Sequence, residues 1–214
     1  MKYKYYLFDL DGVIVNTDEI QYNSTKDAVF EFINYDISKD YEVSDVFRTT
    51  ITTLEKLNFL KSRVPLIEQY ISDIYKRKKQ LADYNFSKFK DDYEKIEMMS
   101  YLKNNKCKIA IVTNSNKQSA LKILKSIGVI DFIDVIVSNE DVLNAKPNPE
   151  PYLNAIEILS AKKEECIIFE DSEVGLISAR QSGCDFYNVK SHSSVNIELI
   201  NKINLQTANN AHKD

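Results

Sequence analysis

The segment Tyr5-Tyr6-Leu7-Phe8-Asp9-Leu10-Asp11-Gly12 joins a short apolar run to two aspartates and a glycine. Three later segments have the same form, an apolar run closed by polar residues: 109–112, 135–137 and 166–169. Apolarity that is continuous rather than alternating is typical of strands buried on both faces, as in parallel sheets. We therefore predict four buried strands, and residues 186–189 could supply a fifth.

Helical patterns separate these runs, at residues 117–127, 150–159 and 174–182. Strand and helix thus alternate from residue 93 to residue 190, which predicts an α/β fold with a doubly wound parallel sheet. This core domain is expected to comprise residues 1–16 and 93–214. The tail after Val189 is polar, and we expect it to be only partly ordered.

Residues 17–92 have a different pattern, without a comparable strand run. Apolar side chains recur at spacings of three and four between Leu66 and Leu81, which indicates an amphipathic helix. Residues 28–33 suggest another helix. The segment 17–92 is therefore expected to be an α-helical domain inserted after the first strand.

The composition argues against several classes of function. The 28 basic and 32 acidic residues give a net charge of -4, so bulk charge favours neither nucleic acid nor an anionic membrane as a partner. The amino terminus lacks the apolar stretch of a signal peptide, and no segment has the roughly 18 consecutive apolar residues of a transmembrane helix. We expect a soluble, cytoplasmic protein.

Histidines and cysteines narrow the chemistry further. The only histidines, His192 and His212, lie in the polar tail, so a Ser-His-Asp or Cys-His mechanism has no base at hand. Cys107, Cys166 and Cys184 are far apart in the sequence and form no C-x-x-C pair. They are interpreted as buried thiols, and neither a zinc knuckle nor a disulfide framework is indicated. Catalysis would then depend on carboxylates, lysines and hydroxyls.

Polar residues follow all four predicted strands, at the edge where open parallel sheets bind ligands. Phosphoryl transfer needs a nucleophile, a general acid or base, a hard cation and positive charge near the phosphate. Carboxylates can supply oxygen ligands for Mg2+, a threonine at a helix start can face an anion, and a lysine can offset negative charge. The residues concerned are Asp9, Asp11, Thr113, Asn114, Ser115, Glu140, Asp141, Lys146, Glu170, Asp171 and Ser172.

Each of these groups also has a structural explanation when it is taken alone. Asp9 and Asp11 can belong to a strand-end turn, and Lys146 can be a solvated loop lysine. The segments 113–115 and 170–172 can cap helices. Together these explanations require four unrelated coincidences at one edge of a sheet, so we favour a site that handles phosphate.

The same segments resemble the motifs of the haloacid dehalogenase superfamily, in the same order and over nearly the whole chain. Residues 6–14 are similar to the first motif and residues 111–115 to the second. Lys146-Pro147-Asn148-Pro149 resembles the third motif, and Phe169-Glu170-Asp171-Ser172, followed by Gly175, resembles the fourth. Within the superfamily the chain is most similar to the beta-phosphoglucomutase and phosphoglycolate phosphatase group.

The resemblance implies a role for each site residue. Asp9 would be the phosphorylated nucleophile and Asp11 the general acid and base, which points to phosphate chemistry because dehalogenases lack this second acid. The segment 17–92 would be a cap over the site. Phosphate would be bound by Thr113, Asn114 and Lys146, and Mg2+ by Asp9, the carbonyl of Asp11, and Asp171, with Glu170 assisting.

The inserted segment departs from that group in places that bear on the substrate. Gln21 stands where the mutases carry a histidine, Asn16-Thr17-Asp18 replaces their D-[ST]-E, and their Gly-rich loop is missing, although Arg48-Thr49-Thr50 lies near its place. These departures favour a phosphatase acting on a small phosphorylated metabolite over a sugar-phosphate mutase. A non-catalytic protein that binds a phosphorylated metabolite is the third possibility.

The candidate substrate contacts are Gln21, Arg48 and Lys79. Lys79 belongs to a basic run, 76–79, for which a solvated helix face is the favoured alternative. We expect the protein to be a monomer or a weak homodimer.

Overall fold

The computed structural model describes residues 1–49 and 52–210. Two compact units make up the chain: residues 1–16 together with 89–214, and residues 17–88. The second boundary therefore lies near residue 88 rather than at residue 92. Thr50 and His212, both named above, lie outside the described residues. None of the described helices combines the length and the apolar character that crossing a membrane would need.

The first unit is built on a sheet of five parallel strands, which confirms the predicted α/β fold. The order in the sheet is β3-β2-β1-β4-β5, with β1 in the centre. The four expected runs and the optional fifth all form strands, although β5 begins one residue earlier than expected. The strands are β1 (Tyr5–Phe8), β2 (Lys108–Val112), β3 (Val135–Val137), β4 (Cys166–Glu170) and β5 (Asp185–Asn188).

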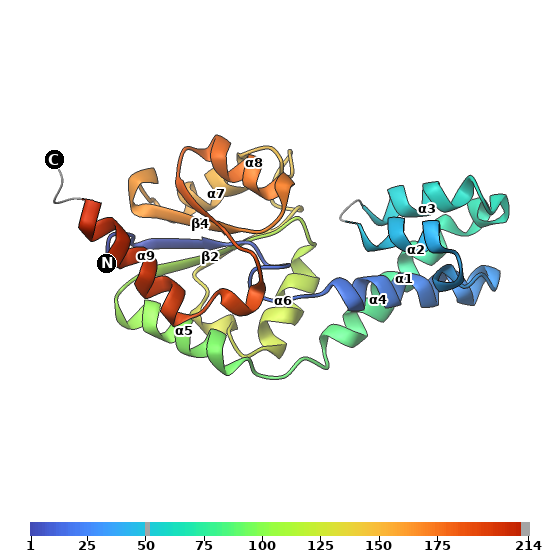
Figure 1. Cartoon of the computed structure of the whole chain (residues 1–214), viewed down its shortest axis with the longest axis horizontal. Coiled ribbons are helices and arrows are strands. Elements are labelled where there is room, and N and C mark those ends of the chain that lie inside the picture. The colour runs from blue at the N-terminus through green and yellow to red at the C-terminus, as the bar shows by residue number, and fades with distance from the viewer. Residues whose placement is uncertain (50–51, 211–214) are drawn as a thin grey trace. The chain divides into compact units, whose positions relative to one another are not determined.

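Helices cover both faces of this sheet, as a doubly wound fold requires. Helices α7 and α8 lie on one face, and α5, α6 and α9 lie on the other (Figure 1). Short 3-10 turns occur at Ile130–Phe132, Lys163–Glu165 and His192–Ser194. The helices are α5 (Tyr93–Asn104), α6 (Lys117–Ser126), α7 (Glu150–Ile158), α8 (Glu173–Ser182) and α9 (Ile197–Asn210).

Both faces of the sheet are packed with apolar side chains. On one face, Leu7, Ala110 and Ile168 belong to a buried cluster that also includes residues of α7 and α8. On the other, the rings of Phe8 and Phe169 stack with their centroids 4.7 Å apart. The continuous apolarity of the strand segments follows from this double burial.

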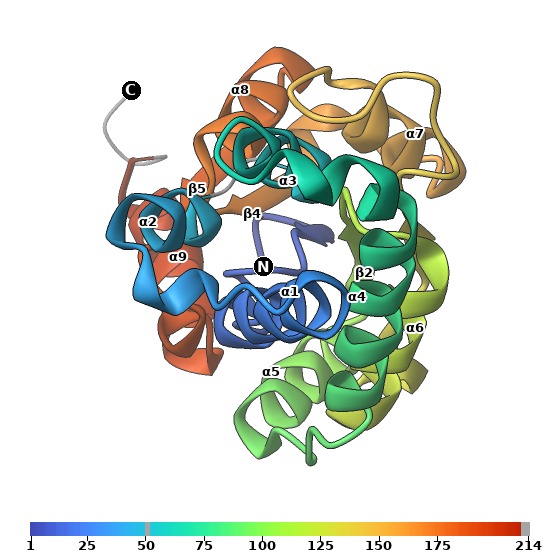
Figure 2. The ribbon, with the colours of Figure 1, turned by 90° about the vertical axis from the view of Figure 1, so that its right-hand side faces the viewer.

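The second unit is helical, with α1 and α4 lying side by side (Figure 2). The expected helix from residue 66 begins as a 3-10 turn, Pro65–Tyr70, and continues as an α-helix. Two further helices were not predicted, and Thr52 and Glu55 form a capping box at the start of the second of them. The unit contains α1 (Asp18–Ile33), a 3-10 turn (Ile37–Lys39), α2 (Tyr41–Arg48), α3 (Thr53–Lys61) and α4 (Ile71–Phe86).

The polar tail after Val189 contains a helix that was not predicted, α9, at Ile197–Asn210. Leu199, Ile200 and Ile203 are all buried, at a spacing that places them on one face of the helix. The many Asn residues around them hide this short apolar pattern in the sequence.

A buried lysine connects α5 to the segment before α9. Lys95 is 1% exposed, and its Nζ donates hydrogen bonds to the carbonyl oxygens of His192 (2.7 Å) and Val195 (2.6 Å). Burial lowers the pKa of Lys95, because the charged form loses its hydration. The lysine therefore provides a hydrogen-bond donor for two main-chain carbonyl groups that would otherwise be buried without a partner.

We expect Lys95→Met to lower the free energy of unfolding by about 1–3 kcal/mol, because two carbonyl groups lose their donor. Methionine fills a similar volume and avoids the cost of burying a charge, which limits the loss. Urea unfolding followed by circular dichroism measures the effect. The matched control is Lys125→Met, at an exposed position of α6, which should change stability by less than about 0.5 kcal/mol. Equal stability of the two variants would contradict the role of Lys95.

Candidate active site

The turn after β1 presents two aspartates at the carboxyl edge of the sheet. Asp9 remains attached to the neighbouring strand, since its N–H donates to the carbonyl oxygen of Phe169 at 3.0 Å. The chain then turns sharply, with Gly12 at φ +79° and its N–H bonded to the oxygen of Val15 at 2.6 Å. Asp9 is buried, whereas Asp11 is half-buried.

Lys146 is the centre of the site's hydrogen bonds. Its Nζ lies 2.6 Å from Oδ1 of Asp9 and 2.6 Å from Oε1 of Glu170. The same nitrogen donates to the carbonyl oxygen of Val112 at 2.7 Å. Only 3% of the Lys146 side chain is exposed, which contradicts the interpretation as a solvated loop lysine. Burial lowers the pKa of Lys146, but the negative charges of Asp9 and Glu170 outweigh this effect. The pKa of Lys146 is therefore raised above its ordinary value.

The side chain of Asn114 hydrogen bonds to the main chain of Lys146. Its Oδ1 accepts from the Lys146 N–H at 3.2 Å, and its Nδ2 donates to the Lys146 carbonyl oxygen at 3.3 Å. The side-chain amide is thus engaged with the loop, and its predicted contact with phosphate stays a prediction.

Thr113 is placed by the register of the sheet. Phe8 pairs with Ile111 across β1 and β2, so Thr113 lies two positions further along, at the edge that Asp9 also occupies. Its N–H donates to the Val137 oxygen at 2.9 Å, and its hydroxyl oxygen accepts from the N–H of Ser115 at 3.0 Å. Thr113 is therefore fixed at the turn that leads to α6.

Three carboxylates come together at this edge. Asp9, Glu170 and Asp171 each offer an oxygen, and these oxygens lie within 4.8 Å of one another. Burial raises the pKa of Asp9, and Lys146 opposes the shift. Although part of Asp171 is open to solvent, desolvation of its carboxyl group and repulsion from Glu170 raise its pKa to about 6.

This charge distribution fits a divalent cation. When ionised, the three carboxylates carry three negative charges, and Lys146 supplies one positive charge, which leaves two uncompensated. Oxygen ligands from carboxylates are those that Mg2+ and Ca2+ prefer. The donor set of Asp9 and Asp171, with Glu170 beside them, is therefore chemically suited to hold a hard divalent ion.

Two glycines allow the carboxylates to lie against bare backbone. A Cβ built on Gly12 would stand 2.0 Å from Oδ2 of Asp171. A Cβ built on Gly175 would stand 2.0 Å from Cδ of Glu170. Any larger residue would collide with an acid of the cluster, which explains why two of the chain's four glycines lie near acidic segments.

Tyr152 belongs to this network, although sequence reasoning assigned it no role. Its hydroxyl donates to Oε1 of Glu170 at 2.6 Å and accepts from Nζ of Lys146 at 3.1 Å. The residue is fully buried on α7, where it shares a face with Ala155 and Ile156. In the sequence this stripe is indistinguishable from ordinary core packing, so only the hydroxyl group hints at a polar partner.

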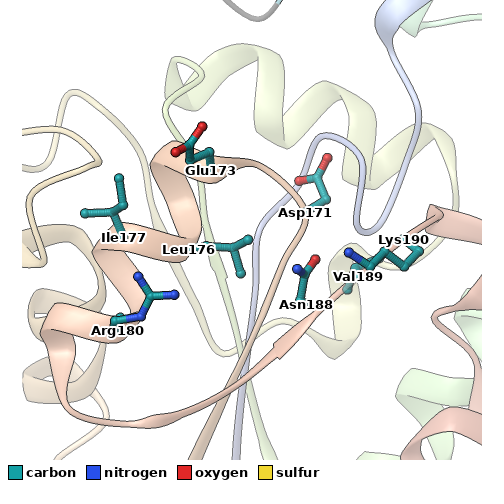
Figure 3. Close-up of a pocket in the computed structure, with 8 residues that line it drawn as sticks. All are labelled: Asp171, Glu173, Leu176, Ile177, Arg180, Asn188, Val189 and Lys190. Carbon is teal, nitrogen blue, oxygen red and sulfur yellow. The ribbon is translucent and has the colours of Figure 1, made fainter.

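A pocket of about 440 Å³ borders the acidic cluster on the side of α8 and β5 (Figure 3). Asp171 stands at one side of it, and Leu176 lines its interior. Arg180 and Lys190 bring positive charge to the same hollow. A ligand near Asp171 thus has room on the surface of the first unit itself.

The candidate substrate residues all lie in the helical unit. Gln21 accepts a hydrogen bond through Oε1 from Nζ of Lys78, so Lys78 rather than Lys79 is its partner in the basic run. Arg48 pairs with Glu19 at 2.9 Å and lies over the ring of Tyr22, 4.0 Å from its centroid. Lys79 is half-buried. Their contact with a substrate stays a prediction.

Comparison with known proteins identifies the family. The model of the haloacid dehalogenase-like hydrolases matches residues 6–189. Pyrophosphatase PpaX of Halalkalibacterium halodurans is 33% identical over 178 residues, which are 83% of this chain and 79% of that protein.

Solved structures that share the fold include the following two. The beta-phosphoglucomutase of Clostridium difficile has a TM-score of 0.72 at 20% identity and covers 94% of this chain and 96% of its own. A predicted phosphoglycolate phosphatase of Haemophilus somnus has a TM-score of 0.76 at 17% identity, with coverages of 95% and 99%. Because the family match and the Halalkalibacterium relative each cover most of the chain, the protein belongs to the haloacid dehalogenase-like hydrolase family and is an enzyme, as its sequence predicted.

Proposed function

We propose that the protein is a Mg2+-dependent phosphatase that acts on a small phosphorylated metabolite through an aspartyl-phosphate on Asp9. One observation carries this proposal. Asp9, Glu170 and Asp171 bring carboxylate oxygens within 4.8 Å of one another, and Lys146 bonds two of these acids. A nucleophile, a cation site and a fixed ammonium group are what phosphoryl transfer to a carboxylate requires.

The contacts of the site suggest how its residues divide the work. Lys146 fixes one oxygen of Asp9, which leaves the other to attack phosphorus. Asp11, two residues on, would protonate the leaving oxygen and then take a proton from the attacking water. The phosphate would lie near Thr113 and the N–H groups at the start of α6.

The cation would be held by Asp9, Asp171 and the main-chain carbonyl of Asp11. When bound, Mg2+ supplies charge that offsets the negative oxygens of the phosphate. Glu170 fits a supporting place, because its Oε1 already accepts from Lys146 and Tyr152. Its carboxylate would then orient Lys146 and add negative charge beside the ion.

The relatives add a candidate substrate. The Halalkalibacterium protein is named a pyrophosphatase, and 33% identity over most of both chains favours pyrophosphate among the substrates to be tried first. A sugar-phosphate mutase is the second candidate, supported by the fold it shares with the Clostridium difficile enzyme. A non-catalytic metabolite-binding protein is the third.

A phosphate-release assay with Mg2+ separates these candidates. The panel holds inorganic pyrophosphate, phosphoglycolate, sugar phosphates and nucleotides, and glucose 1-phosphate is tested with a bisphosphate activator. Release of phosphate supports the phosphatase, and formation of an isomer without release supports the mutase. Tight binding without any turnover would leave only the binding protein.

The helical unit is proposed to select the substrate through Gln21, Arg48 and Lys79. This assignment rests on the family resemblance. A cytoplasmic location and a monomeric or weakly dimeric state also stay predictions.

Asp9→Asn should abolish turnover and phosphoenzyme formation, because a neutral amide is a poor nucleophile. Asp11→Asn should keep the nucleophile but lose acid-base help, which is typically worth about 10² to 10⁴ in rate. Rapid quench followed by intact mass spectrometry should therefore detect an added phosphoryl group on Asp11→Asn and none on Asp9→Asn. A phosphoryl adduct on Asp9→Asn would show that the nucleophile lies elsewhere.

Asp171→Asn should weaken Mg2+ binding, because a neutral oxygen replaces a charged hard ligand. Activity should fall at low Mg2+ and recover in part at high Mg2+. The matched control is Glu173→Gln, a neighbouring acid at the start of α8 that lies outside the carboxylate cluster. Titration of Mg2+ with activity as the readout should shift for Asp171→Asn alone. An unchanged titration would remove Asp171 from the metal site.

Lys146→Met should destabilise the metal-free protein by about 3–5 kcal/mol, the usual cost of leaving buried charge without its partner. Without the ammonium group the pKa of Asp9, already raised by burial, should rise further. A carboxyl group with a raised folded-state pKa destabilises the fold increasingly as the pH rises from its unfolded-state pKa to its folded-state pKa, so the loss should shrink as the pH falls from 8 towards 5.

The control for this change is Tyr152→Phe, which removes only the hydroxyl group bonded to Glu170 and Lys146. It should cost about 1–3 kcal/mol and show a weaker dependence on pH. Urea unfolding with a chelator present, repeated across this pH range, measures both variants. A pH-independent loss for Lys146→Met would contradict the pairing with Asp9.

A further inference from the structure

Two of the three cysteines lie side by side at the amino ends of β4 and β5. The parallel register pairs Ile167 with Asp185 and continues to Glu170 and Asn188. One position earlier, the same register makes Cys166 and Cys184 lateral neighbours, although they are 18 residues apart in the sequence. Lateral neighbours on parallel strands lie about 4.8 Å apart and direct their side chains to the same face. Disulfides join Cα atoms that are about 4.4–6.8 Å apart, so this placement satisfies the first geometric condition.

The two sulfur atoms share one environment. Cys166 is fully buried and Cys184 is 8% exposed, and both belong to the apolar cluster between the sheet and helices α7 and α8. Each thiol shifts the pKa of the other, which requires the two sulfur atoms to be close. The Cys166 S–H donates to the carbonyl oxygen of Lys162 at 3.1 Å. The two thiols are thus close neighbours in the reduced protein.

The two thiols differ in acidity and access. The hydrogen bond from Cys166, with help from Ser182 and the charge of Lys163, lowers the pKa of Cys184 to about 7. The same hydrogen bond, together with burial, raises the pKa of Cys166. Cys184 also lines a surface pocket of about 440 Å³ together with Lys2 and Tyr3. The more acidic thiol therefore belongs to the more exposed of the two residues, at 8% against 0%.

Cys107 is excluded as a partner by the strand order. It precedes β2, and Lys108 pairs with Tyr5, which in turn pairs with Cys166. Two strand spacings amount to about 10 Å, beyond the reach of a disulfide bond. Cys107 instead lies 3.4 Å from Sδ of Met1 and serves as an internal control.

We propose that Cys166 and Cys184 form a redox-active dithiol that closes to an intramolecular disulfide in exchange with a low-molecular-weight disulfide such as glutathione disulfide. The Cys184 thiolate attacks one sulfur of the small disulfide and releases one thiol, forming a mixed disulfide. Cys166 then attacks the Cys184 sulfur, its proton is transferred to the departing sulfur, and a second small thiol leaves. The two protein thiols lose two electrons, and the small disulfide gains them.

The placement also predicts the order of the two steps. Cys184 should react first because it is the more exposed of the two and more often a thiolate. Cys166 should act only afterwards, because it is buried and keeps its proton. Removing one cysteine or the other should therefore stop the reaction at different stages.

The test uses the full-length protein, folded and freshly reduced, in a series of glutathione redox buffers. Free thiols are blocked with iodoacetamide, and intact mass and peptide mapping identify the products. The wild-type protein should lose two hydrogen atoms and two alkylation sites, with a crosslink between the peptides that carry Cys166 and Cys184. Cys107→Ser should behave in the same way.

Two single variants test the mechanism. Cys166→Ser should accumulate a stable glutathione adduct on Cys184, because the second thiol is missing. Cys184→Ser should leave Cys166 unmodified in the folded protein, and circular dichroism confirms that each variant is folded. The proposal is overturned if glutathione disulfide leaves both cysteines of the wild-type protein alkylatable, or if the wild-type protein stops at the mixed disulfide. Neither outcome depends on whether the variants fold.

Discussion

Two buried carboxylates share one ammonium group, and the arrangement of the sheet depends on that pairing. Nζ of Lys146 contacts Asp9 beyond β1, the carbonyl oxygen of Val112 at the end of β2, and Glu170 at the end of β4. These strands are adjacent in the order β2-β1-β4. A slip of one residue in β1 or β4 would turn an acid away from Lys146 and leave buried charge unpaired, which costs several kcal/mol. The register and the site are therefore specified by the same contacts.

The carboxylates of the site outnumber its ammonium group, so negative charge remains uncompensated. Two glycines in the backbone make room for these crowded acids. Gly12 and Gly175 bring bare main chain against Asp171 and Glu170, at distances that no Cβ could tolerate. Tyr152 occupies one oxygen of Glu170 together with Lys146, so that carboxylate is held in a single orientation. Glu170 is thus both crowded and held by two donors. Crowding of this kind is stable when a divalent cation completes the charge balance.

The sequence predicted those parts of the structure whose signals are local. Buried strands such as Tyr5–Phe8 read as continuous apolar runs because both of their faces are covered. Helix α9 was missed because the buried apolar residues among its described side chains, Leu199, Ile200 and Ile203, are separated by polar neighbours. The role of Tyr152 was missed for a different reason: its partners, Lys146 and Glu170, are assembled only by tertiary structure. In the same way, the basic run 76–79 contains four cations, and only the packing of α1 on α4 makes Lys78 the partner of Gln21.

Strand β4 carries chemistry at both of its ends, and the two kinds of chemistry are separate. Its last residue, Glu170, belongs to the acidic cluster, and its first, Cys166, belongs to the proposed dithiol. Four residue steps of about 3.3 Å place them about 13 Å apart. Every residue of the strand is buried. Between its two ends there is therefore no exposed side chain that could move into solvent and accommodate a shift of the strand. A disulfide at the amino end would tie β4 to β5 without touching the carboxyl edge. It would therefore act first on the stability of this pair of strands, and on the carboxylate cluster only to the extent that the strand itself shifts.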